Sequence, residues 1–163
     1  MSCLGVHFAL DQKQHDKLIG ATNDDGVKAV LAEIEEAWHK DHVGESDKAW
    51  DAIHRCLTDG SLDDEAGEFP LNHVILGGKQ LHSGDDYIVA LVTADQAKEV
   101  AKALLPISKE TLRSSYSTID PDDYEGEISN DDFEYTWEWF ENVREFYLRA
   151  SINSRSVIFT VDL

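Results

Sequence analysis

The stretch Ser156-Val157-Ile158-Phe159-Thr160-Val161, close to the end of the chain, decides the predicted fold. It is a run of apolar and β-branched residues, which favour a strand, at a place where an undocked tail is normally polar. A second apolar run, Cys3 to Leu10, lies near the other end, and Tyr87 to Val92 supplies an internal strand. We therefore predict that the two terminal strands lie in one small sheet.

Several helices are predicted between these strands. Asp11 with Gln14, and Thr93 with Gln96, match the capping box that opens a helix. The expected helices begin after Asp11, after the turn Asn23 to Gly26, at Ser46 or Asp47, at Pro70 (ending before Gly77), after Thr93, at Ser108 and at Asp132. Because we find no internal repeat and no low-complexity linker, we predict a single α+β domain over residues 1–163, packed by several helices.

The last helix, from Asp132 to about Ser151, is predicted to be the central core element, because aromatic residues surround most of its circumference. Four acids fill the remaining gap: Glu134, Glu138, Glu141 and Glu145. Like charges at i,i+4 cost a few tenths of a kcal/mol per pair. Either basic residues elsewhere in the fold neutralise this stripe, or a basic partner does.

The net charge of −19, from 33 acidic against 14 basic residues, is the most unusual property of the composition. Such a surface repels phosphate backbones and anionic lipid headgroups, so we expect neither nucleic-acid nor membrane binding. The first residues resemble no signal peptide, and Cys3 and Cys56 alone cannot make a disulfide framework or a zinc site. We expect a cytoplasmic protein whose charge serves solubility or a basic partner.

The residues from Asp47 to Arg55 place ionisable groups on neighbouring positions of a predicted helix. Asp47, Trp50 and His54 share a flank, where a carboxylate could orient the histidine as a base. The structural alternative is that Trp50 marks a buried face and His54 is a hydrogen-bonded core histidine. Asp51 and Arg55 would then be an ordinary i,i+4 pair.

Arg144 lies within the aromatic stripe of Trp137, Phe140 and Tyr147. It could stack on the rings and bind a carboxylate, so that Arg144 and Tyr147 line a ligand pocket. Alternatively, Arg144 closes a buried ion pair that fixes the fold. We expect no metal and no cofactor: the pair His39 and His42 lacks a third ligand at a recognisable spacing, and no phosphate loop or nucleophile elbow is present.

Several stretches, in the same order, resemble the YfbM-like family of small uncharacterised bacterial proteins, a domain of unknown function. They are Gly5 to Leu10, Asp47 to Leu57, Pro70-Leu71 through Gly77-Gly78, Leu91-Val92-Thr93, Arg144 to Tyr147 with Ala150, and the terminal strand. The resemblance covers nearly the whole chain and implies an α+β fold in a bacterial cytosol. It implies no biochemical activity.

Two hypotheses for function remain. The first is a non-catalytic acidic binding module, an inhibitor of the immunity type or an adaptor, that docks a basic protein through Glu134, Glu138, Glu141 and Glu145. The second is a small enzyme or small-ligand binder with a pocket near His54 and Arg144. The residues assigned to that pocket are Asp47, Trp50, Asp51, His54, Arg144 and Tyr147, and no catalytic residue is assigned.

Overall fold

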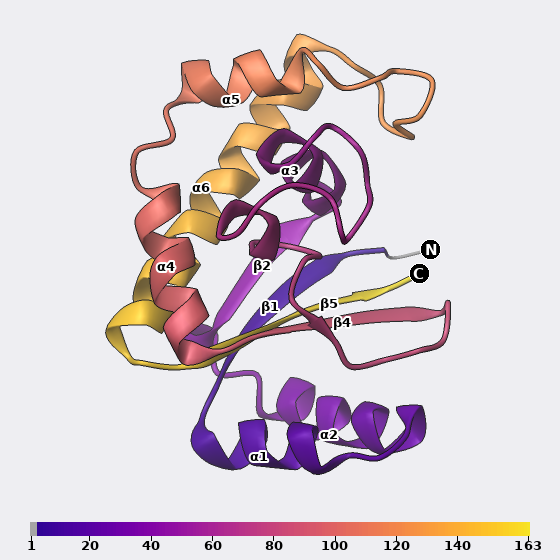
Figure 1. Cartoon of the computed structure of the whole chain (residues 1–163), viewed down its shortest axis with the longest axis vertical. Coiled ribbons are helices and arrows are strands. Elements are labelled where there is room, and N and C mark those ends of the chain that lie inside the picture. Colours follow the sequence, from indigo (N-terminus) through magenta and orange to yellow (C-terminus); the bar gives the residue numbers. More distant parts are fainter. Residues whose placement is uncertain (1–2) are drawn as a thin grey trace.

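An antiparallel sheet runs through the middle of the molecule in the computed structural model, which describes residues 3–163 (Figure 1). Met1 and Ser2 lie outside the described residues. They belong to the first residues of the chain, which resemble no signal peptide. Within residues 3–163 the sheet has five strands in the order β2-β1-β5-β4-β3. They are β1 (Gly5–Leu10), β2 (Val43–Asp47), β3 (Lys79–Gln80), β4 (Tyr87–Val92) and β5 (Ser156–Asp162).

The terminal strands do lie in one sheet, as the sequence predicts. β5 is the central strand, and it pairs antiparallel with β1 on one side and with β4 on the other. Phe8 lies opposite Ile158, which in turn lies opposite Leu91. The fold class is therefore α+β.

Helices cover both faces of the sheet (Figure 1). Over the described part of the chain they are α1 (Gln12–Gly20), α2 (Asp24–Ala37), α3 (Trp50–Leu57), α4 (Ala94–Leu104), α5 (Lys109–Tyr116) and α6 (Asn130–Ile152). Figure 1 shows α1 and α2 below the sheet and α3, α4 and α6 above it. Both predicted capping boxes are confirmed, at Asp11 with Gln14 and at Thr93 with Gln96. Among residues 3–163, no helix combines the length and the apolarity that crossing a membrane requires.

Two apolar layers result, one on each face of the sheet. On the α1 and α2 side, Phe8 and Leu10 of β1 pack with Ile158 of β5. On the other side, Ala9 of β1 and Phe159 of β5 pack against α3, α4 and α6. Since successive side chains of a strand point to opposite faces, a sheet covered on both faces needs strands that are apolar at nearly every position. This explains the continuous apolar runs of β1, β4 and β5.

The helix predicted to begin at Ser46 or Asp47 does form, as α3, but its predicted start is wrong, because Ser46 and Asp47 end β2 and α3 begins only at Trp50. Tertiary contacts override the local signal here. The side chain of Phe146 lies 2.6 Å from where a Cβ on Gly44 would stand, so this glycine lets α6 approach the strand closely.

Side chains of α6 cover the outer edge of β2. Asn142 donates to the carbonyl of Glu45 at 2.6 Å, and Arg149 donates to the carbonyl of Val43 at 3.3 Å. These hydrogen bonds satisfy two backbone carbonyls that the edge strand would otherwise leave unpaired.

The predicted helix from Pro70 to Leu76 is also wrong over most of its length. Only the short 3-10 turn Leu71–His73 forms. The following residues, Val74 to Leu76, are buried as part of the larger apolar layer. The carbonyl of Val74 accepts hydrogen bonds from two side chains of other elements instead of from a helical N–H, as described below.

The prediction that the last helix lies in the core is confirmed. Four of its aromatic side chains are at most 1% exposed: Phe133, Phe140, Phe146 and Tyr147. Trp137 and Trp139 are half-buried, and Leu148 is 39% exposed, so the helix keeps one solvent-facing side.

Candidate functional site

Asp47 and Trp50 each have a structural contact in the folded chain. Asp47 ends β2, and it accepts hydrogen bonds from the hydroxyl of Tyr135 at 2.8 Å and from the N–H of Lys48 at 2.7 Å. Trp50 opens α3, is 7% exposed, and donates its indole N–H to the carbonyl of Cys3 at 2.9 Å. The two residues therefore do not share a helix flank, because Asp47 lies before the helix.

His54 is fully buried on α3. Its Nε2 lies 2.8 Å from the carbonyl oxygen of Asp63, so Nε2 carries the proton and donates it. Its Nδ1 is buried and has no hydrogen-bond partner among residues 3–163. Burial lowers the pKa of His54 below its ordinary value, which keeps the ring neutral near pH 7. The interpretation of His54 as a hydrogen-bonded core histidine is thus confirmed.

Asp51 and Arg55 form the predicted i,i+4 ion pair, with Nε of Arg55 2.6 Å from Oδ1 of Asp51. The guanidinium is 3% exposed and also pairs with Asp123 at 2.6 Å. Burial raises the pKa of the Asp51 carboxyl, and the neighbouring Arg55 opposes that rise. The second pair was not predicted, and it attaches the acidic segment after α5 to α3.

Arg144 stacks on aromatic rings as the sequence suggests, with its guanidinium 5.4 Å from the ring centre of Trp137 and 5.2 Å from that of Phe140. The alternative expectation of a buried ion pair is wrong: among the described residues Arg144 has no carboxylate partner and instead donates to the carbonyl of Ile107 at 2.7 Å. Carbonyls beyond the end of α4 supply the negative partial charge that attracts a cation.

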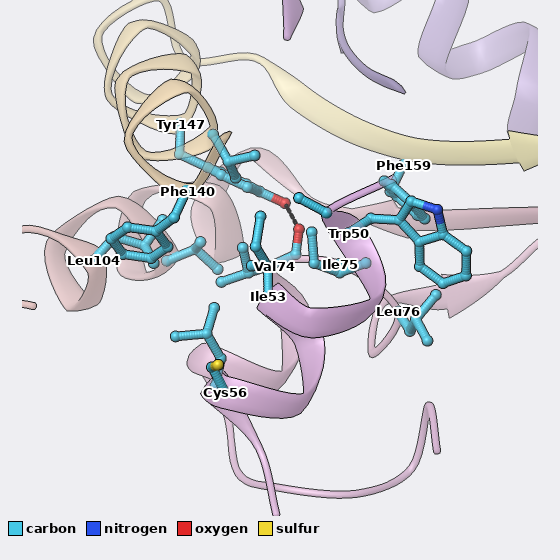
Figure 2. Packing of buried hydrophobic residues seen from close by; sticks show 14 of the residues in the cluster. Trp50, Ile53, Cys56, Val74, Ile75, Leu76, Leu104, Phe140, Tyr147 and Phe159 are labelled. Carbon is cyan, nitrogen blue, oxygen red and sulfur yellow. Dashed lines mark hydrogen bonds between the residues drawn. The ribbon is translucent and has the colours of Figure 1, made fainter. Parts of the chain in front are cut away.

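Tyr147 is directed into the core. Its hydroxyl donates to the carbonyl of Val74 at 2.9 Å, and burial raises its pKa. Figure 2 shows this hydroxyl aimed at Val74, among the apolar side chains of Ile53 and Ile75. Within residues 3–163, the hydrogen bonds of His54 and of Arg144 share no residue. The predicted pocket residues thus make contacts within the fold, and of these six Tyr147 reaches Val74.

His7 is a buried polar residue whose role the sequence does not reveal. It is fully buried on β1, and its Nε2 donates to the carbonyl of Val74 at 2.8 Å, the same oxygen that Tyr147 contacts. Burial lowers its pKa to about 4. The signal in the sequence that could have identified His7 is its position. It is the polar residue in the otherwise apolar run of β1, and because it is next to Phe8, its side chain points to the opposite face of the sheet.

The pKa of His7 predicts an acid-sensitive fold. The folded pKa of about 4 lies below the ordinary value of 6.5, so the unfolded chain binds the proton first as the pH falls. The stability contributed by His7 is complete above pH 6.5, and about 3 kcal/mol of it is lost between pH 6.5 and pH 4. We expect H7Q, which keeps a donor but does not titrate, to flatten the pH dependence of the unfolding free energy in that window. Urea denaturation at several pH values measures this, and parallel curves for the two proteins would contradict it.

The acidic stripe of α6 divides into two kinds of residue. Glu134 pairs with Lys109 at 2.6 Å and with Arg113 at 3.3 Å, and Glu145 pairs with Arg149 at 3.0 Å. Glu138 and Glu141 are exposed, and neither forms an ion pair with any residue from 3 to 163. The fold therefore neutralises the two ends of the stripe and leaves its middle charged.

The pair His39 and His42 lies at the surface, with ring centres 5.0 Å apart. Over residues 3–163, no cluster of three or more His, Cys, Asp or Glu side chains is arranged to hold a metal ion. The buried thiol of Cys56 has a pKa raised to about 12 by burial, so it is protonated near neutral pH.

The fold is similar to that of YfbM from Escherichia coli, a protein of unknown function whose crystal structure is known. The two chains superpose with a TM-score of 0.70 at 18% sequence identity, over 97% of this chain and 99% of the other. No curated protein matches the sequence. The model of the domain of unknown function DUF1877 matches residues 1–160, and the chain therefore belongs to that family.

Proposed function

We propose that the chain is a cytoplasmic, non-catalytic binding module that docks a basic protein on the exposed acidic side of α6. The observation that carries the proposal is the unpaired middle of the stripe, Glu138 and Glu141. Repulsion within the stripe opposes helix formation, and a partner that supplies Lys or Arg removes that cost. An inhibitor of the immunity type and an adaptor both fit such a surface.

The surroundings of these two glutamates support the same proposal. Trp139 follows Glu138 in the sequence, about 100° round the helix axis from it, and is half-buried, so part of its ring is exposed. Aromatic residues beside charges are typical of interface centres, because they bury a large area at a low entropic cost. Glu45 is exposed on the neighbouring strand β2, and α6 is bonded to its carbonyl through Asn142. The acidic surface thus extends from the helix to the sheet edge.

The alternative, a ligand pocket near His54 and Arg144, has less support. His54 is fully buried, and its Nε2 is used by the carbonyl of Asp63. Arg144 already donates to backbone carbonyls and stacks on two rings. A ligand there would have to replace these contacts.

Reversing both unpaired charges, in E138K/E141K, tests the proposal. Because the change relieves like-charge repulsion, we expect an unchanged or slightly higher melting temperature. We expect the association rate with the basic partner to fall about tenfold at low salt, with a smaller effect at high salt. The partner is first captured from native bacterial lysate on immobilised protein and eluted by salt, and its rates are then measured in purified form.

The control variant D16K/E36K makes the same change of charge on α1 and α2, on the other face of the sheet. It should leave the association rate close to that of the unmodified protein. Equal association rates for all three proteins would contradict the proposal and would mean that the charge of Glu138 and Glu141 serves solubility. A lower melting temperature of E138K/E141K would mean that these glutamates are paired within the fold, as Glu134 is.

A further inference from the structure

A hollow of about 320 Å³ lies where the end of β1, the C-terminal end of α2 and the 3-10 turn Lys40–His42 meet the start of β5. Figure 1 shows β1, α2 and β5 meeting at the end of the sheet away from the two chain ends. The floor of the hollow is apolar, because it is formed by the buried side chains of Phe8, Ile34 and Val43. An apolar floor with a few polar groups at the rim, in a space of this size, is typical of small-ligand sites.

Arg155, at the rim of this hollow, has few internal contacts. The one described hydrogen bond of its side chain is a long one, 3.5 Å to the carbonyl of Ala9, and within residues 3–163 the guanidinium forms no ion pair. Arg144, by comparison, donates to the carbonyl of Ile107 at 2.7 Å. The other three arginines all pair with carboxylates: Arg55, Arg113 and Arg149. In a chain with 33 acidic residues, a guanidinium without a carboxylate partner at the rim of a hollow points to a partner from outside the chain.

The other polar groups of the hollow fit the same partner. Asp11 is the acid among the lining residues, and its carboxylate already accepts the N–H of Gln14 at 2.7 Å to cap α1. His39 and His42 flank the opening and can each donate an N–H. The pKa of His42, which lines the same hollow as Arg155, is lowered by burial and by the charge of that guanidinium.

We propose that this hollow binds a small organic carboxylate, with its apolar body on Phe8 and Ile34 and its carboxylate on the guanidinium of Arg155. The planar fork of an arginine matches the two oxygens of a carboxylate. A singly charged head group is favoured over a dianion such as phosphate, because the chain carries a net charge of −19 and Asp11 lines the same hollow. This site shares no residue with the acidic side of α6.

Titration with phenylacetate, followed by NMR of the labelled protein, tests the proposal. We expect the resonances of Phe8, Ile34 and the Arg155 side chain to shift together. The neutral isostere phenylacetamide should bind at least about tenfold more weakly, since a charged hydrogen-bonded pair contributes more than a neutral one. The variant R155M should bind phenylacetate and phenylacetamide with similar affinity. It should also melt near the temperature of the unmodified protein, because the side chain of Arg155 makes little internal contact.

Two further variants keep the test decisive. K98M removes a half-buried base that lies outside the hollow and should leave binding unchanged. A37F fills the hollow while Arg155 remains, so it should weaken phenylacetate binding even if R155M fails to fold. Equal affinity for phenylacetate and phenylacetamide, shifts confined to other residues, or normal binding by A37F would each overturn the proposal.

Discussion

Deleting residues 156–163 is expected to abolish folding. This segment contains β5, the central strand, so its loss leaves β1 and β4 without their shared neighbour. It also removes Ile158 from one apolar layer and Phe159 from the other, both at most 1% exposed. Each large buried side chain contributes about 1.5–3 kcal/mol, and a whole domain is stable by only about 5–15 kcal/mol. Circular dichroism during heating should show no cooperative transition.

The control for this deletion removes Leu163 alone, which lies beyond β5 and is 44% exposed. That shorter deletion should keep the cooperative transition close to its original temperature. A cooperative transition in the chain that ends at Arg155 would show that the remaining strands form a stable core without β5, against the topology described above.

The fold class could be predicted because its main signal is local. The apolar, β-branched composition of β5 identifies a strand without reference to any other residue. β2 could not be found in this way: Val43 is its one β-branched residue, and Ser46 and Asp47 are typical helix caps. What makes it a strand is non-local, namely its pairing with β1 and the close approach of Phe146 to Gly44.

The candidate site likewise contains contacts that local sequence predicts and contacts that depend on how distant helices pack. The ion pair of Asp51 with Arg55 follows from helical spacing, so the sequence predicts it. The neutralisation of Glu134 depends on Lys109 and Arg113, which α5 brings to α6 from 25 and 21 positions away. Helical spacing within α6 accounts for the pair of Glu145 with Arg149, but it shows Glu134 and Glu138 as equivalent. The packing of α5 against α6 distinguishes Glu134 from Glu138.

The replacement W50A is expected to lower the unfolding free energy by about 3–5 kcal/mol, as other large aromatic-to-alanine changes in cores do. Trp50 is 7% exposed, packs with its ring centre 5.9 Å from that of Phe159, and donates its indole N–H to the carbonyl of Cys3. The change therefore opens a cavity between α3 and β5 and also removes a hydrogen bond. Urea denaturation measures the loss.

The matched control is W38A, the same substitution at a tryptophan that is 45% exposed and touches the edge of Phe8. We expect it to cost no more than about 1 kcal/mol. W50F helps to separate the two contributions, because it keeps one aromatic ring in the core and removes the indole donor with the smaller part of the side-chain volume, at an expected cost of about 1–2 kcal/mol. If W50A cost less than about 1 kcal/mol, as W38A should, the contacts of Trp50 would not hold α3 on the sheet. Its place in the sequence Asp47 to His54 would then again favour a role in recognition.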